Sequence, residues 1–131
     1  MSQFKLEVVT PTGRVVDVST DQVTAPGLLG EIGILPSHRP ALIQLGGGTI
    51  RYNGGEVIVR GGVAEVRADG VLVLADEAVT PAKADRARAE GILQAAVAGL
   101  GQSREYLDDE RAARLGSDRA YAEAVLRVAG H

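Results

Sequence analysis

The hydrophobic pattern of this 131-residue chain changes at Thr80 and Pro81, and this change constrains the fold more than any other feature. Before it, apolar and polar residues alternate, for example over residues 4–8. Such alternation is typical of β-strands whose two faces meet different surroundings. After it, Ala, Arg, Glu, Leu and Lys dominate, and these residues favour helices. The sequence therefore predicts two domains, a β-rich one at residues 1–80 and a helical one at residues 81–131.

Turn signals divide the first part every 8 to 12 residues, a spacing typical of sandwiches and barrels. The chain has one Phe, three Tyr and no Trp, so its core must consist of Val, Ile, Leu and Ala. We predict a mainly β N-terminal sandwich of about ten strands. The turn signals include the Gly-rich stretches Gly46-Gly47-Gly48, Asn53-Gly54-Gly55 and Gly61-Gly62, and the step Asp69-Gly70.

The second part of the chain predicts a C-terminal α-helical hairpin. Thr80 is a good N-cap and Pro81 suits the first helical position, so the first helix should begin there. Gly99 and Gly101 end it. One face of this helix collects apolar residues at steps of three and four: Ala89, Ile92, Leu93, Ala96 and Leu100.

The second arm of the hairpin is helical in composition over residues 104–115 and 119–129. Between them, Gly116-Ser117-Asp118 predicts a break in the helix followed by a new N-cap, so the second arm could be interrupted there. Ala-rich faces bury few methylenes, so at about 25 cal/mol per Å² the hairpin gains little by packing. Compact and extended forms could then differ by a few kcal/mol, a gap that a ligand or partner can invert.

Charge and composition exclude several classes of function. The 14 basic and 17 acidic residues give a net charge of −3, which argues against nucleic-acid binding because phosphate neutralisation requires a basic excess. With no Cys and two His, the chain excludes disulfides and thiolate catalysis, and we expect no metal site. No apolar stretch approaches about 18 residues. We expect a soluble, unexported protein that meets a membrane through partners, without direct insertion.

A turn-rich segment at residues 30–48 lies between two strand-like regions. Two glycines three apart come first, and Pro36 and Pro40 then fix φ around a Ser37-His38-Arg39 tip, which predicts a rigid connection. Rigid loops often present a binding surface. Gly46-Gly47-Gly48 lacks the Lys of a phosphate-binding loop and precedes a strand-like stretch, so we expect a loop before a strand.

Together with residues 61–66 and 71–76, this segment resembles the epsilon subunit of bacterial F-type ATP synthases. The resemblance covers nearly the whole chain, and the order of sandwich and helical hairpin agrees with it independently. It implies a non-catalytic rotor subunit of the central stalk. The sandwich would couple proton flow to ATP synthesis, and the C-terminal helices would inhibit ATP hydrolysis.

The resemblance also implies partners and a location. The sandwich would bind the gamma subunit and the c-subunit ring, and the hairpin would reach the alpha and beta catalytic subunits. As part of the synthase, the chain would lie peripherally on the cytoplasmic side of the cell inner membrane. No cofactor is required by this role, although ATP is a candidate regulatory ligand.

Three residues of the rigid segment are candidate contacts with the gamma subunit and the c ring. The resemblance places Glu31 against polar loops of the ring, where a carboxylate on a rigid turn could pair with a basic group. The residues alone favour a solvated turn carboxylate at Glu31 instead. His38 and Arg39 belong by resemblance to the same surface, with Arg39 replacing a small residue. A catalytic His38 is not expected, because no nucleophile or nucleophile elbow accompanies it.

The segment at residues 84–89 resembles the family's nucleotide-binding motif, which implies ATP contacts from Asp85, Arg88 and Ala89. The Arg88 guanidinium could bind phosphate, and the Asp85 carboxylate could accept a hydrogen bond from adenine or ribose. Ala84 departs from the larger aliphatic residue of the motif. An ordinary ion pair between Asp85 and Arg88 on a solvated helix face explains both residues equally well. Further phosphate contacts, or contacts with acidic segments of beta subunits, could come from later arginines: Arg114, Arg119 and Arg127.

Two other classes of function compete with this interpretation. The first is a free-standing β-sandwich binding module whose helical tail mediates oligomerisation. An exposed apolar face of the sheet would favour a stalk subunit, whereas self-association without a stalk partner would favour the module. The second is an enzyme, which is the weakest because no nucleophile, base and orienting group can be assembled from these residues.

Overall fold

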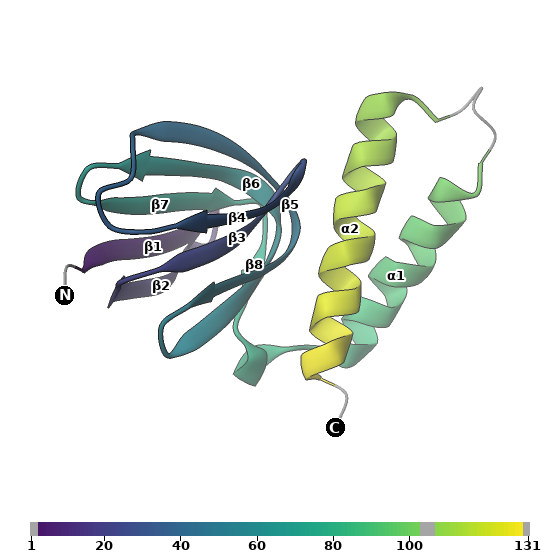
Figure 1. Cartoon of the computed structure of the whole chain (residues 1–131). Helices are drawn as coiled ribbons and strands as arrows, with labels where there is room; N and C mark the ends of the chain where they lie inside the picture. The colour runs from purple at the N-terminus through teal and green to yellow at the C-terminus, as the bar shows by residue number, and fades with distance from the viewer. Residues whose placement is uncertain (1–2, 103–106, 130–131) are drawn as a thin grey trace.

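The computed structural model describes residues 3–102 and 107–129. A sheet comes first and a helical hairpin follows it (Figure 1). The strands are β1 (Phe4–Thr10), β2 (Gly13–Thr20), β3 (Val23–Gly27), β4 (Gly30–Ile34), β5 (Ala41–Tyr52), β6 (Gly55–Arg67), β7 (Gly70–Ala75) and β8 (Ala78–Val79). The helical elements are the 3-10 turn η1 (Pro81–Lys83) and the α-helices α1 (Arg86–Leu100) and α2 (Asp109–Val128).

The sheet curves round to enclose a core, as Figure 1 shows. Its strand order is β2-β1-β7-β6-β5-β3-β4, and β8 pairs with β6. Strands β1 and β7 are parallel, and the other pairs are antiparallel. Strands β5 and β6 have 12 and 13 residues and pair along most of their length. The prediction of a β-sandwich followed by a helical hairpin is confirmed.

The sequence predicted more strands than these eight because Gly-rich stretches are typical of turns, and each predicted turn divides a strand in two. In the structure, Gly46-Gly47-Gly48 and Gly61-Gly62 lie inside β5 and β6. Gly47 pairs with Arg60 and Gly62 with Ala75, so the ladders continue through the glycines. The expected loop at Gly46-Gly47-Gly48 is therefore wrong, because hydrogen bonding to neighbouring strands outweighs the local preference of glycine for turns.

The core consists mainly of aliphatic side chains, as the composition predicts, and also includes Phe4. Leu6 on β1 and Ile50 on β5 are fully buried in it, as are Val57 and Val59 on β6. Ile58 points to the opposite face of β6 and is also fully buried, but in a second cluster with residues of the hairpin. The hairpin thus covers a face of the sheet that would otherwise meet water. The second cluster contains Ile58, Ala89, Tyr121, Ala124 and Val125.

Helix α1 begins later than the sequence predicts. Thr80 makes no capping hydrogen bond with its side chain, and Pro81 opens the short turn η1 instead. Ala84 then has an extended backbone, which separates η1 from the helix. Asp85 is the actual N-cap, since its Oδ1 accepts a hydrogen bond from the backbone N–H of Arg88 at 3.1 Å. A carboxylate that reaches this N–H satisfies a donor at the helix N-terminus, which Thr80 does not do.

Helix α2 is continuous through Gly116-Ser117-Asp118, so the break predicted there is wrong. The helix begins at Asp109, and the Asp108 side chain caps it by accepting from the backbone N–H of Arg111 at 2.7 Å. The Asp118 carboxylate binds Arg60 on β6 instead of capping a new helix. A glycine inside a helix costs only about 1 kcal/mol relative to alanine, which contacts such as this one can offset. Residues 103–106 of the predicted second arm lie outside the described part.

Gly47 allows α2 to pack closely on β5. A Cβ atom at this position would overlap the carbonyl oxygen of Ser117 and would lie 3.0 Å from the backbone nitrogen of Tyr121. A Cβ at Gly46 would meet only ordinary contacts, with Ser117 Oγ at 3.6 Å. The close approach of the helix backbone to the strand is therefore possible only at a glycine, and Gly47 fixes where α2 lies on the sheet.

The predicted domain boundary falls between β8, which ends at Val79, and η1, which starts at Pro81. Whether residues 1–80 and 81–131 fold as independent units stays a prediction. Within the described ranges, neither helix is long and apolar enough to cross a membrane.

Substitution of two glycines should change stability in opposite directions. Gly62 has φ of 138°, and a Cβ there would overlap the Leu74 carbonyl oxygen. Gly116 lies in α2 with nothing within 4 Å of an added Cβ. We expect Gly62→Ala to lower the free energy of unfolding by about 2 kcal/mol or more. Gly116→Ala should raise it by up to about 1 kcal/mol. Urea unfolding followed by circular dichroism measures both, and equal stability of the two variants would contradict the prediction.

Candidate functional site

An apolar surface lies at the hairpin between β3 and β4 and on the adjoining part of β5. Leu29 is fully exposed, Leu42 is 73% exposed and Leu28 is 43% exposed. The tight turn between Gly27 and Gly30 directs Leu28 and Leu29 outward, and the backbone N–H of Leu28 donates to the Gln44 carbonyl at 2.9 Å. These three leucines border a groove whose remaining lining is Gly27, Gly30, Glu31, Ile32, Ile43 and Gln44.

Large apolar side chains gathered at one exposed place mark a protein contact more often than a monomer surface. We call Leu28, Leu29 and Leu42 the leucine surface. Reasoning from the sequence missed these residues. The available signal was a Leu-Leu pair in a turn between Gly27 and Gly30, where polar residues are usual.

The three predicted contact residues lie at two ends of β4. Glu31 is near the start of β4, opposite Pro26 on β3, and borders the leucine surface. His38 and Arg39 follow the other end of the strand. The His38 ring packs edge-on against Phe4, with ring centroids 5.3 Å apart. Neither ring nitrogen of His38 has a hydrogen-bond partner among the described residues. The contacts of these three residues with gamma and the c ring stay predictions.

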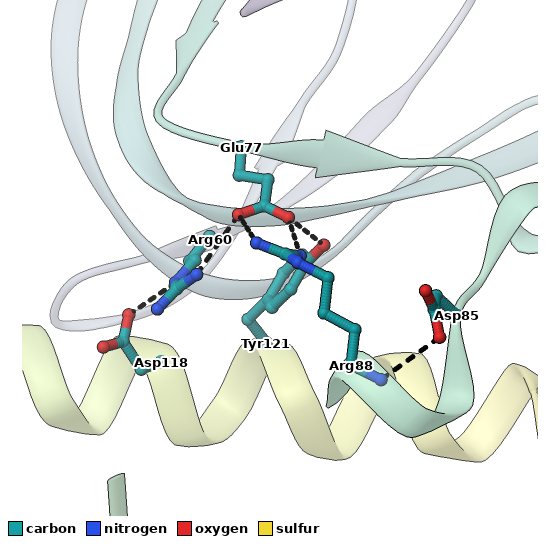
Figure 2. Close-up of polar contacts among 6 residues, drawn as sticks. All are labelled: Arg60, Glu77, Asp85, Arg88, Asp118 and Tyr121. Atoms are coloured by element: carbon teal, nitrogen blue, oxygen red, sulfur yellow. Dashed lines mark hydrogen bonds and ion pairs between the residues drawn. The ribbon is translucent and has the colours of Figure 1, made fainter. Parts of the chain in front are cut away.

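A second candidate site is a cluster of charged groups between the sandwich and the hairpin (Figure 2). Glu77 lies between β7 and β8. Its carboxylate accepts a hydrogen bond from each terminal nitrogen of Arg88: Nη1 donates to Oε2, and Nη2 donates to Oε1 at 2.9 Å. The same carboxylate accepts from Arg60 Nη1 at 3.2 Å and from the Tyr121 hydroxyl at 3.1 Å. Arg60 also binds a second carboxylate, because its Nε donates to Asp118 Oδ1 at 2.8 Å. We call these five residues the Glu77 cluster.

The Glu77 cluster shifts the pKa of several of its members. Burial disfavours the charged form of Glu77, but hydrogen bonds from Arg88 and Arg60 outweigh it and lower the pKa of the carboxyl. The hydrogen bond to Asp118 raises the pKa of Arg60, and the hydrogen bond to Glu77 raises that of Arg88. Burial and the neighbouring Glu77 charge raise the pKa of Tyr121 to about 12. At neutral pH the Glu77 carboxylate and the two guanidiniums are thus charged, and Tyr121 is a hydrogen-bond donor.

The predicted ATP-binding residues already have roles within the chain. Asp85 caps α1, and the Arg88 side chain binds Glu77, so these two side chains do not form the ordinary ion pair that was the alternative. Ala89 is buried between hairpin and sheet. Arg119 pairs with Glu123 on α2 at 3.6 Å, and Arg127 donates to Thr49 on β5 at 3.1 Å.

A shallow pocket beside the Glu77 cluster includes Lys83, Asp85 and Arg88. Regulatory ATP binding there stays a prediction. Among the side chains that the structure describes, no three His, Asp or Glu residues gather in a group that could hold a metal ion.

The raised pKa of Tyr121 predicts a loss of stability at alkaline pH. Its folded pKa of about 12 exceeds the ordinary value of 10.0, so its contribution is complete below pH 10 and is lost as the pH rises toward 12. An absorbance titration of tyrosine ionisation measures the raised pKa of Tyr121 from which this loss of stability follows. Tyr121→Phe should lack the step near pH 12 and keep the rest of the curve. A Tyr121→Phe curve identical to the native one above pH 10 would contradict the prediction.

Comparison with known proteins agrees with this architecture. A family model described as the β-sandwich domain of the ATP synthase delta/epsilon chain matches residues 3–81. The ATP synthase epsilon chain of Syntrophobacter fumaroxidans is 39% identical, over 96% of this chain and 93% of that protein. The ATP synthase epsilon chain of Neisseria meningitidis serogroup B is 38% identical, over 98% of this chain and 94% of that protein.

Two solved structures share the fold. One is a chain of the Euglena gracilis mitochondrial ATP synthase, with a TM-score of 0.69 and 22% identity, covering 100% of this chain and 83% of that chain. The other is from the central stalk and c ring of the Tetrahymena thermophila mitochondrial ATP synthase, with a TM-score of 0.60 and 15% identity, covering 95% and 97%. Because the family model matches more than half of the chain and the Syntrophobacter relative matches nearly all of it, this chain belongs to the family of ATP synthase epsilon chains.

Proposed function

We propose that this chain is a non-catalytic central-stalk subunit of an F-type ATP synthase. In this role the sandwich couples proton flow to ATP synthesis, and the hairpin restrains ATP hydrolysis. The observation that carries the proposal is the leucine surface: three exposed leucines of the sandwich border one groove, and two of them, Leu29 and Leu42, are more than two thirds exposed. The relatives named ATP synthase epsilon chain and the structural neighbours from stalk and c-ring assemblies support it.

The leucine surface is the proposed contact with the gamma subunit and the c ring. Burying a leucine contributes about 1.5 to 3 kcal/mol, so three leucines can anchor a stable interface. Glu31 at the edge of this surface would supply a rim charge that orients the partner. The short turn between β3 and β4 holds Leu28 and Leu29 in place before binding, which lowers the entropy lost in the complex.

The hairpin is the proposed regulatory part, acting on the alpha and beta catalytic subunits. It meets the sheet through a small apolar cluster, in which two of the five buried residues are alanines, and through charged groups. Such a contact can be exchanged for one with another protein, because charged groups find new partners more readily than a large apolar core does. The chain would be held at the cytoplasmic side of the cell inner membrane by its partners.

A non-catalytic role agrees with the surroundings of the one described histidine. His38 packs against Phe4, and both of its ring nitrogens are buried. A general base must reach the proton that it removes, and this ring faces an aromatic side chain instead. ATP synthesis and hydrolysis would take place in the alpha and beta subunits.

Removing the hairpin should relieve inhibition without preventing assembly. The assay is ATP hydrolysis by a catalytic complex depleted of its epsilon subunit, to which the full chain or a chain ending at Thr80 is added. We expect both to bind and only the full chain to slow hydrolysis. If both bind and neither slows hydrolysis, the chain is chiefly a coupling element and its regulatory role is lost. If neither binds and the chain associates with itself, a free-standing module with an oligomerising tail is the better description.

A charge on the leucine surface should prevent assembly. Leu29→Glu places a carboxylate where the proposed interface is apolar, and we expect roughly tenfold to hundredfold weaker binding to the gamma subunit and c ring. Val97→Glu is the matched control, because Val97 is also exposed but lies on α1. Titration by biolayer interferometry measures both. Equal binding by Leu29→Glu and Val97→Glu would remove the leucine surface from the interface.

A further inference from the structure

We infer that Glu77 holds the helical hairpin in its docked position, which is its packing against the sandwich, and we call Glu77 the latch. The Glu77 carboxylate binds Arg88 as a bound anion would, so the docked position requires no nucleotide. This inference deepens the proposed regulatory role of the hairpin and rests on it for its biological meaning. It concerns the isolated chain, however, and is tested there.

The backbone of Glu77 is anchored firmly to the sandwich. Its carbonyl accepts from the backbone N–H of Arg60 at 2.9 Å, and the preceding residue, Asp76, donates its N–H to the Gly61 carbonyl at 3.1 Å. Directly after Glu77, β8 pairs with β6. The carboxylate therefore projects from a fixed point of the sheet toward both helices, as Figure 2 shows.

From this point the carboxylate binds groups on three elements. Arg60 belongs to β6, Arg88 to α1 and Tyr121 to α2. Arg60 carries the connection onward to Asp118, one turn of α2 before Tyr121. Glu77 is thus the group through which the sheet holds both arms of the hairpin at once.

Burial of the carboxylate separates the Glu77 contacts from ordinary surface ion pairs. The side chains of Arg60, Glu77 and Asp118 are 26%, 29% and 18% exposed, and only Arg88 of these four is about half exposed, at 49%. By contrast, the ion pair between Arg86 and Glu90 on α1 is 58% and 52% exposed. Exposed pairs contribute little because water screens them, whereas unpairing a partly buried charge leaves it without the solvation that it has in water.

Charge balance makes the cluster sensitive to the loss of Glu77. Two guanidiniums, Arg60 and Arg88, face two carboxylates, Glu77 and Asp118. Without the Glu77 charge, one carboxylate, Asp118, remains beside two cations, and Arg88 loses the negative charge that it binds. The apolar cluster beneath cannot easily compensate, because its contributions from α1 and α2 include the small side chains Ala89 and Ala124.

Glu77 also occupies the donors of Arg88 that a phosphate would need. Nη1 and Nη2 of Arg88 both point at the Glu77 carboxylate. A bidentate carboxylate and a phosphate oxygen pair use the same fork of a guanidinium. A phosphate-bearing ligand would thus have to displace Glu77, and with it the connection from sheet to hairpin.

The experiment measures the docked fraction of the isolated full chain. Because the chain has no cysteine, Asp69→Cys on the sandwich and Ala113→Cys on α2 accept a donor and an acceptor dye for single-molecule energy transfer. Glu77→Gln and Arg88→Gln remove one charge each from the cluster. Arg86→Gln is the matched control, two residues from Arg88 on α1 and paired only at the surface. Circular dichroism checks that the sandwich stays folded.

We expect Glu77→Gln and Arg88→Gln each to raise the ratio of undocked to docked chains roughly tenfold, and Arg86→Gln to leave it unchanged. The double variant should raise this ratio no further than the more severe single variant does, because both substitutions remove the same interaction. Magnesium ATP at millimolar concentration should not change the docked fraction of the native chain. A docked fraction in Arg88→Gln equal to that in Arg86→Gln would overturn the inference, as would a rise of the native docked fraction with ATP.

Failure of this inference and failure of the proposed function give different results. The energy-transfer measurement needs no synthase, so it can support the latch even if the hairpin does not slow hydrolysis. Conversely, the full chain could inhibit hydrolysis while Arg88→Gln leaves the docked fraction unchanged. That result would support a regulatory role of the hairpin and reject Glu77 as its latch.

Discussion

The packing of α2 on the sheet is the contact on which the arrangement of this chain depends. Gly47 admits the backbone of α2 at Ser117, and this position sets which side chains of the helix meet β6. Asp118 then falls beside Arg60, and Tyr121 falls beneath Glu77. A larger residue at Gly47 would lift the helix and separate these partners. A steric condition at one strand residue thus decides an electrostatic arrangement along two turns of helix.

The two candidate functional surfaces of the chain differ in their physical chemistry. The leucine surface is apolar and exposed, which suits a lasting contact with another subunit. The Glu77 cluster is charged and partly buried, and it lies between two parts of the same chain. Charged contacts are specific in geometry but gain little net free energy over water. A hairpin held in this way suits the proposed release, whereas the proposed contact through the leucines would be lasting.

Much of the fold was predictable because it depends on patterns that are local. Alternation over the first part of the chain and helix-forming composition in the second led to the correct order of sandwich and hairpin. Local reasoning failed wherever a distant residue outweighed local preference. Gly47 lies within β5 because β6 pairs with it, and Gly116 lies within α2 because the residues after it bind the sheet. Asp85, rather than Thr80, caps α1.

By itself, the sequence determined the fold class, the aliphatic core and the family, because periodicity, composition and short motifs are properties of neighbouring residues. It also singled out Arg88 as a candidate ATP contact, which stays a prediction, but did not reveal its partner within the chain. Only the tertiary structure decided that Arg88 binds Glu77 and that Leu29 and Leu42 share one exposed surface. The physical reason is distance along the chain: such contacts depend on how strands pair and where a helix lies, and no short stretch of sequence contains that information.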